Sequence, residues 1–141
     1  VGAEGTPMSP DLAPLIDNLG ARLAFERVGT RLYDALLSKH DAYGSFDGGP
    51  SRSDLEQLRR EEHEHMLLLH GALTGLGADP TAVTASANLQ LTIGRGIPDV
   101  ATDARTTLLE SLEAALVAEL ADGASWESLI AIAEAHGFDE L

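Results

Sequence analysis

Apolar residues recur at steps of three and four along three long stretches of this chain. The stretches run from residue 10 or 14 to about 40, from about 53 to 76, and from about 103 to 136. This spacing is typical of helices that bury one face, and no segment alternates apolar and polar residues as a half-buried strand does. The pattern therefore predicts an all-α protein built from three main helices.

Capping signals indicate where the helices begin and end. Ser53 and Glu56 have the spacing of a capping box at the start of the second helix, and Gly77 is a typical stop after it. Gly29 and Gly123 fall inside the first and third helices, where a glycine costs about 1 kcal/mol relative to alanine. These two glycines lower the helix propensity of the segments around them.

The connectors between the helices differ in length. Residues 41–52 form a short, polar, Gly-rich segment that suits two antiparallel neighbours, whereas residues 78–102 form a much longer connector. A helix of about 25 residues is about 37 Å long, so a connector of this length can return the chain along the whole bundle. We therefore expect residues 10–141 to form one up-down helical bundle with a long crossover at about 78–102. A disordered N-terminal segment, residues 1–9, is expected to precede it.

In the second helix, an acidic residue and a histidine occupy the apolar stripe. Glu62 and His65 lie three residues apart, so their side chains point the same way from neighbouring turns. Glu61, His63 and Glu64 fall on the solvent side. The stripe consists of Leu55, Leu58, Glu62, His65, Leu69, Ala72 and Leu76. The alternative is a charged helix surface whose phase differs from this one.

The first and third helices each place one glutamate in a stripe of the same kind. Glu26 follows Leu19 and Leu23, and Glu119 follows Leu116. Each of the three helices thus carries a glutamate near its middle, on the side expected to face the core. Such carboxylates need cations, because an unpaired buried carboxylate costs several kcal/mol.

Arginine or a metal ion could supply the positive charge. The arginines considered as partners lie off the predicted stripes; they are Arg22, Arg27, Arg31 and Arg59. The chain has no cysteine, so a metal site must use oxygen and nitrogen ligands. Carboxylates with an imidazole favour iron or manganese, with zinc as a further option. The stripes thus predict a metal site formed by Glu26, Glu62, His65 and Glu119.

Together these residues resemble the ferritin-like di-metal carboxylate bundle. The resemblance rests on Glu26, on Glu62-x-x-His65, on the long crossover and on Glu119. Stretches such as AFERVGTRLYDALL and LVAELADGASWESLIAIAEA are similar to small bacterial ferritin-like domain proteins of unassigned role. The resemblance implies that Glu26, Glu62 and His65 hold one iron, with Glu62 and Glu119 able to bridge to a second. It also implies Fe(II) oxidation, a ferroxidase-type oxidoreductase activity, as the reaction to test.

The family pattern includes a second Glu-x-x-His on a fourth helix, and the present sequence does not contain it. Glu134 and His136 are only two residues apart, so they cannot replace it. We expect a shortened chain, a homodimer in which a partner chain completes the core, or loss of the second ion. The alternative function is a helical interaction or scaffold protein that has lost the complete di-metal centre.

Three residues near the predicted ligands allow two interpretations each. Tyr33 and Trp126 follow Glu26 and Glu119 by seven residues, so they either pack one layer away or act near the site, through a hydrogen bond or as an electron relay. Asp122 is either a helix-surface residue or a group that orients a ligand imidazole.

The charge balance excludes several classes of function. Nine Lys and Arg against 23 Asp and Glu give 9 − 23 = −14, with a pI near 4.5. Such a protein repels nucleic acid and anionic membranes and attracts cations. No apolar run approaches the ~18 residues of a membrane span, and the first residues lack the pattern of a secretion signal. We therefore expect a cytoplasmic protein whose partners are metal ions and a second copy of the chain.

Overall fold

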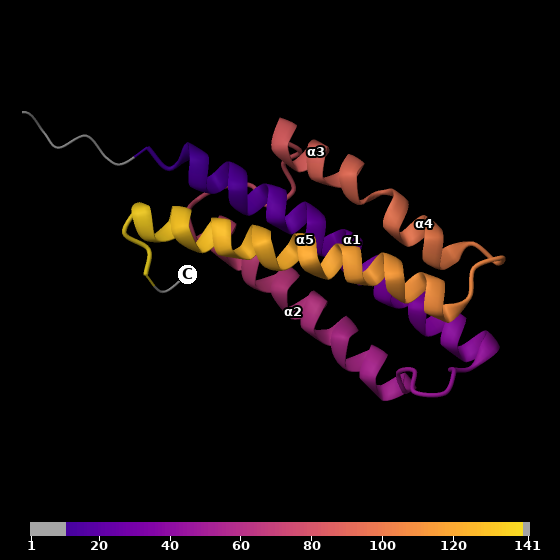
Figure 1. Ribbon diagram of the computed structural model, residues 1–141. Helices are drawn as coiled ribbons and strands as arrows, with labels where there is room; N and C mark the ends of the chain where they lie inside the picture. The colour runs from indigo at the N-terminus through magenta and orange to yellow at the C-terminus, as the bar shows by residue number, and fades with distance from the viewer. Residues whose placement is uncertain (1–10, 140–141) are drawn as a thin grey trace, which may run out of the picture.

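Residues 11–139 are described by the computed structural model, and they fold into five α-helices (Figure 1). The helices are α1 (Ala13–Tyr43), α2 (Arg52–Gly75), α3 (Ala85–Gly94), α4 (Gly96–Thr102) and α5 (Leu108–Ala135). No strand occurs in this part of the chain, which confirms the all-α prediction. The N-terminal segment predicted to be disordered, residues 1–9, lies outside the described residues.

The capping box of α2 lies two residues earlier than predicted. The hydroxyl of Ser51, rather than that of Ser53, accepts a hydrogen bond from the Asp54 amide at 3.2 Å. The Asp54 carboxylate in turn accepts one from the Ser51 amide at 2.8 Å. An aspartate in place of the usual Glu or Gln made this start hard to find in the sequence. The predicted stop is confirmed, because Gly77 has a φ of 76° just after α2 ends.

Helix α5 begins at Leu108, later than the predicted start at about residue 103. Thr107 and Glu110 form a second capping box at this point. The turn that precedes it is held by the buried Lys39 of α1, whose ammonium group donates a hydrogen bond to the Asp103 carbonyl at 2.8 Å. A buried lysine paired in this way fixes the start of α5 against α1.

The long connector at 78–102 contains α3 and α4, two short helices that the apolar pattern did not indicate. Both pack along one side of α1 (Figure 1). The approach of α3 is close at Gly94, where an added Cβ would lie 3.1 Å from side-chain atoms of Val28. The connector therefore covers a face of α1 while it returns the chain along the molecule.

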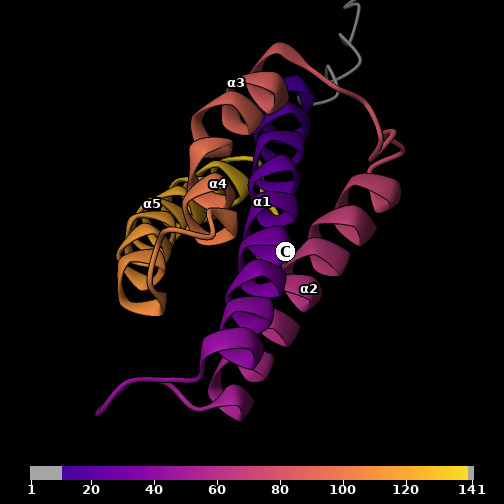
Figure 2. The ribbon, with the colours of Figure 1, turned by 90° about the vertical axis from the view of Figure 1, so that its right-hand side faces the viewer.

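Helix α1 is the centre of the molecule. It contacts all four other helices, and Figure 2 shows it between α2 on one side and α3, α4 and α5 on the other. Because α1 is enclosed on several sides, a single apolar stripe does not describe its burial. Arg22, predicted to lie off the buried stripe, is 3% exposed and belongs to the core.

The apolar core consists of two clusters along α1. One cluster includes Phe25, Leu32, Leu36, Leu55, Ala115 and Ala118, and the other includes Leu15, Leu19, Leu23, Leu69, Leu73 and Leu129. Between the clusters, α1, α2 and α5 contribute polar side chains, which we call the polar layer: Arg22, Glu26, Glu62, His65, Asp122 and Trp126. The chemistry predicted from the sequence falls in this layer.

The phase predicted for α5 is wrong by one residue. The buried side of α5, which packs on α1 and α4, carries Leu108, Ser111, Ala115, Ala118, Asp122, Leu129 and Ala133. Of the predicted stripe, Ala133 is buried as expected, but Leu109, Leu116 and Ile130 are each at least 50% exposed. The predicted stripe consists of Leu109, Leu112, Leu116, Glu119, Gly123, Trp126, Ile130 and Ala133. Small side chains let α5 approach its neighbours closely, so the larger apolar residues did not identify the packed face.

Helices α2 and α5 lie on either side of α1 and pack only loosely on each other (Figure 2). Leu68 of α2 and Ile130 of α5 line a small hollow between them. None of the helices within residues 11–139 combines the length and apolar character that a membrane span requires.

Candidate metal centre

Glu26 lies in the polar layer and is fully buried, which confirms the inward position predicted for it on α1. Its Oε1 accepts a hydrogen bond from the indole N–H of Trp126 on α5 at 2.8 Å. Its Oε2 is also buried and accepts no hydrogen bond from an N–H group, while the carboxyl groups of Glu26 and Glu62 share a hydrogen bond that lowers the pKa of Glu62. One oxygen of this carboxyl group is therefore held by Trp126, and the other faces His65.

Helix α2 presents two further predicted ligands, Glu62 and His65, to Glu26. Glu62 is 8% exposed whereas His63 is exposed, which confirms the phase predicted for this helix. The Nδ1 atom of His65 lies 3.7 Å from Glu26 Oε2, and it has no hydrogen-bond partner within residues 11–139. The ring of His65 packs edge-on against that of Trp126, with centroids 5.5 Å apart.

Glu26, Glu62 and His65 form the one group of acidic and histidine side chains in the described residues that converges closely enough for a metal ion. One donor atom of each lies within 4.8 Å of the other two. Two donors bound to one ion at about 2.1 Å lie about 3.0 Å apart at a right angle and about 4.2 Å apart when opposite. The 3.7 Å between Glu26 Oε2 and His65 Nδ1 falls within this range.

Glu119 does not join this group. It lies on an exposed part of α5, and its carboxylate accepts a hydrogen bond from the hydroxyl of the buried Tyr33. Burial and then the charge of Glu119 raise the pKa of Glu62, so Glu119 acts at the edge of the polar layer. Its predicted place in the buried stripe is wrong because of the phase of α5. Its role as a ligand to a second ion stays a prediction.

Tyr33 and Trp126 both donate hydrogen bonds near the site, as one of the interpretations of the sequence predicted. Trp126 contacts a predicted ligand directly, through Glu26. Tyr33 contacts Glu119, and burial together with this hydrogen bond raises the pKa of its phenol, which keeps the proton on oxygen. The spacing of seven residues indicated the right region of each helix but not the partner of each side chain.

Asp122 is buried, and its carboxylate pairs with Arg22 rather than with an imidazole. The helix-surface interpretation is wrong, because the shift in the phase of α5 turns Asp122 inward, and its orienting role beside the ligands stays a prediction. The guanidinium of Arg22 lies 4.8 Å from the centroid of the Phe25 ring. Sequence reasoning missed Arg22 as a member of the site, since its position off the apolar stripe suggested exposure.

The polar layer holds more acid than base. Glu26, Glu62, Asp122 and the neighbouring Glu119 carry four carboxylates against the single guanidinium of Arg22, which leaves 4 − 1 = 3 negative charges if all ionise. Burial raises the pKa of Glu26 to about 9, and the charges of Asp122 and Glu62 add to this. Burial also raises the pKa of Glu62 to about 7, with contributions from Glu119 and Asp122. Without another cation, protons therefore neutralise part of this layer at pH 7.

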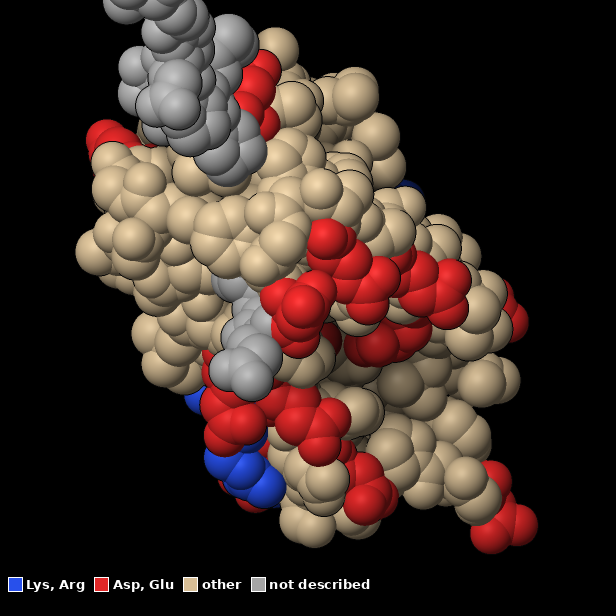
Figure 3. Space-filling model, turned by 90° about the vertical axis from the view of Figure 1, so that its left-hand side faces the viewer, with Lys and Arg blue, Asp and Glu red and all other residues tan. Residues whose placement is uncertain are grey.

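Acidic side chains also gather at the surface. Figure 3 shows a band of Asp and Glu on one face of the molecule, part of it beside a hollow, with only a small patch of Lys or Arg. Together with the net charge of −14, this distribution attracts cations. The side chain of His65 is 44% exposed as a whole, whereas its Nδ1 atom and Glu26 Oε2 are buried.

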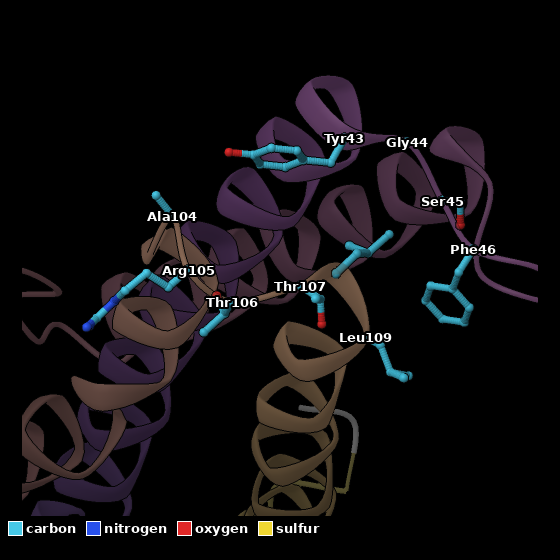
Figure 4. A pocket seen from close by; sticks show the side chains of 10 residues that line it. Tyr43, Gly44, Ser45, Phe46, Ala104, Arg105, Thr106, Thr107 and Leu109 are labelled. Carbon is cyan, nitrogen blue, oxygen red and sulfur yellow. The ribbon is translucent and has the colours of Figure 1, made fainter.

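A second hollow lies at the end of the molecule where α1 ends and α5 begins (Figure 4). Its volume is about 500 Å³, and Tyr43, Phe46 and Leu109 contribute apolar surface to it. The single charged residue of its lining, Arg105, pairs with Asp103. This hollow lacks the converging polar groups of a chemical site, so the polar layer is the stronger candidate.

Comparison of the chain with known proteins finds no matching family model, no matching curated protein and no matching solved structure. The candidate centre therefore rests on the geometry and chemistry of its own residues. The resemblance to ferritin-like bundles stays a prediction.

Proposed function

We propose that this protein binds a divalent metal ion, iron foremost, through Glu26, Glu62 and His65. One observation carries the proposal: donor atoms of Glu26, Glu62 and His65, on two different helices, lie within 4.8 Å of one another, and the buried His65 Nδ1 has no hydrogen-bond partner in the described chain. Unpaired buried polar atoms cost about 1–3 kcal/mol each. A shared cation removes this cost for His65 Nδ1 and also offsets the excess of carboxylates.

The donor set narrows the choice of metal. Two carboxylates and one imidazole suit Fe(II), Mn(II) and Zn(II), and the chain has no thiolate that would select a softer ion. Three protein ligands leave coordination positions for water or an oxidant. The ferritin-like resemblance favours iron, and Fe(II) oxidation is then the reaction to test, with one electron passing from each Fe(II) to dioxygen or peroxide. Glu119 would serve a second ion.

Thermal unfolding of metal-free protein tests the proposal. Fe(II) added without oxygen should raise the melting temperature, because a ligand that binds only the native state stabilises it by mass action. At a free metal concentration 100 times the Kd, the gain is about 2.7 kcal/mol, or roughly 8 °C for a chain of this size. Trp126 is the single tryptophan, so quenching of its fluorescence by Co²⁺ gives an independent measure of binding beside Glu26 and His65.

The variant Glu62→Ala/His65→Ala should lose both the shift in melting temperature and the quenching. Its matched control is His63→Ala/Glu64→Ala, which removes the same two residue types from the exposed side of α2. The control should bind metal as the parent does. Binding that survives in Glu62→Ala/His65→Ala would contradict the proposed ligands. Admission of air to the Fe(II) complex, with near-ultraviolet absorbance as the readout, then tests oxidation separately.

A second candidate function is that of a helical interaction or scaffold protein. It is favoured by the exposed apolar side chains of α5, among them Leu109, Leu116, Leu120 and Ile130. Under this hypothesis, Fe(II), Mn(II) and Zn(II) leave the melting temperature unchanged. Sedimentation velocity would then show self-association or a partner that covers α5.

A further inference from the structure

Gly29 lies in the middle of α1, one turn after Glu26. Glycine is among the least favourable residues in a helix interior, and alanine is the most favourable. The backbone does not require a glycine here, because the glycines with positive φ in the described chain are at positions 44, 48, 77 and 137. The reason for this residue must therefore lie in the space around its Cα atom.

The carboxylate of Glu62 fills that space. A Cβ added to Gly29 would lie 1.9 Å from Glu62 Oε2 and 3.0 Å from its Cδ atom, both well inside van der Waals contact. The contrast with Gly20, on the same helix, is clear: a Cβ added there has no heavy atom within 4 Å. Glu62 thus lies directly against the backbone of α1, in a notch that exists because residue 29 has no side chain.

We propose that Gly29 is a positioning residue of the metal site, whose missing side chain seats the Glu62 carboxylate beside Glu26. The inference rests on the proposed metal-binding function and adds a residue that touches no ion itself. Glu26 and Gly29 share a face of α1, three residues apart, so the notch and the Oε2 atom lie in neighbouring turns. Any larger residue at position 29 moves the carboxylate of Glu62 away from the position in which the three ligands converge.

The expected effect falls on binding rather than on folding. The atoms that an added methyl group meets are at the end of a flexible glutamate side chain, so this side chain can rotate aside without a shift of the backbone. Alanine also favours the helical conformation more than glycine does. Gly29→Ala should therefore fold at least as stably as the parent in the absence of metal, while its site is displaced.

Titration with Co²⁺, followed by its absorption spectrum and by Trp126 fluorescence, tests this. Gly29→Ala should bind Co²⁺ at least about tenfold more weakly than the parent, the size of effect seen when groups that orient metal ligands are changed. The control Gly20→Ala makes the same substitution in the same helix, and it should bind Co²⁺ with the affinity of the parent. Circular dichroism melts of the metal-free proteins should show both variants folded.

A double substitution distinguishes positioning from a general effect on the helix. Glu62→Asp shortens the side chain and withdraws its carboxylate from the added methyl group. In Gly29→Ala/Glu62→Asp, the loss of affinity should therefore be smaller than the product of the losses in the two single variants. Losses that simply multiply would show that positions 29 and 62 act independently, and would overturn the proposal.

The remaining outcomes separate this inference from the function on which it rests. A parent protein that does not bind Co²⁺ overturns both. Equal Co²⁺ affinities of the parent and of Gly29→Ala would overturn the role of Gly29 alone. A Gly29→Ala chain that fails to fold also overturns it, because the added methyl group would then meet something less movable than the Glu62 side chain.

Discussion

Trp126 contacts two of the three proposed ligands at once. Its indole N–H donates to Glu26 Oε1 at 2.8 Å, and its ring packs edge-on against His65. The hydrogen bond fixes which oxygen of Glu26 faces His65, and the ring contact limits the orientation of the imidazole. Trp126 therefore orients ligands from two helices although it is not itself a ligand.

Replacement of Trp126 by phenylalanine should separate these two contacts. Trp126→Phe keeps an aromatic ring beside His65 and removes the N–H that holds Glu26. We expect Co²⁺ affinity, measured by isothermal titration calorimetry, to fall about tenfold or more. Without metal, loss of the hydrogen bond should lower the free energy of unfolding by about 1 kcal/mol. Tyr43→Phe, which removes a donor from an exposed ring, should change neither quantity.

The ligands could be predicted from the sequence more reliably than the groups around them. Glu26, Glu62 and His65 interrupt apolar stripes, and an ionisable residue at such a position is a local signal that needs no knowledge of the fold. The hydrogen bond from Trp126 joins residues 100 positions apart. Such a contact depends on the rotation of α5 about its axis, which spacing along one helix does not determine.

At the scale of whole helices, α5 shows why the phase of an apolar pattern can be ambiguous. Two stripes on this helix satisfy the spacing of three and four. One consists mainly of small residues and packs on α1 and α4, whereas the other holds Leu109, Leu116 and Ile130 and stays half-exposed. Hydrophobicity favoured the stripe of larger residues, but close approach of the helices selected the smaller ones. With the stripe of small residues packed, the side chain of Asp122 is buried and that of Glu119 is exposed.

Helix α1 shows a different limit of the apolar pattern, because other helices pack on nearly every side of its middle. Its residues from Ala21 to Glu26 are all buried, which is more than any one-faced pattern allows. A position off the apolar stripe is then no evidence of exposure. Arg22 lies off the apolar stripe of α1, and it is nevertheless buried and pairs with Asp122 in the polar layer.

Removal of the Arg22 guanidinium should strongly destabilise the metal-free protein. Arg22→Met leaves Asp122, Glu26 and Glu62 without their one positive neighbour, and breaking a buried ion pair from one side costs about 3–5 kcal/mol. We expect a loss of about this size in urea unfolding at pH 8 and a smaller one at pH 5, where Glu26 and Glu62, with their raised pKa values, hold protons.

Two further variants check the cause of this loss. Arg22→Met/Asp122→Leu replaces both partners by apolar side chains and should recover much of the lost stability. Asp41→Asn weakens one of the two ion pairs of the exposed Arg52 and should have little effect, since surface ion pairs contribute little. Equal losses in the single and double core variants would instead indicate that packing by the Arg22 stem is what matters.

At the scale of the whole molecule, the polar layer separates two apolar clusters that would otherwise form one core. The sequence predicted three long helices and a crossover, and it located the middle of each helix as the place where charge enters the core. The sequence did not indicate α3 and α4, because such short helices have too few turns to show a periodic pattern of apolar residues. The result is an acidic protein that carries its excess of carboxylates through its centre.

This arrangement predicts an unusual dependence of stability on pH in the metal-free protein. The pKa of Glu26 is raised to about 9 and that of Glu62 to about 7, against an ordinary value of 4.5 in the unfolded chain. At a pH between the unfolded pKa of 4.5 and the raised pKa of each residue, the native state holds a proton that the unfolded state has released. The free energy of unfolding therefore falls as pH rises. The stabilisation is fully present below about pH 4.5 and is lost as pH rises through 7 toward 9. Urea unfolding in the presence of a chelator, at intervals from pH 5 to pH 9, measures this slope.

A change in global charge could also lower stability as pH rises, and Glu26→Gln separates the two causes. The amide keeps the shape of the side chain and an acceptor for Trp126, but it does not titrate in this range. The variant should show a flatter profile between pH 5 and pH 9 while its surface charge follows that of the parent. Saturating Zn²⁺ should reverse the slope in the parent at pH 5 to 8, because the ion must displace the protons of Glu26 and Glu62 before it binds. A parent whose metal-free stability rises over this range would show that the two carboxyls are ionised in the native state, and that something other than protons already balances the polar layer.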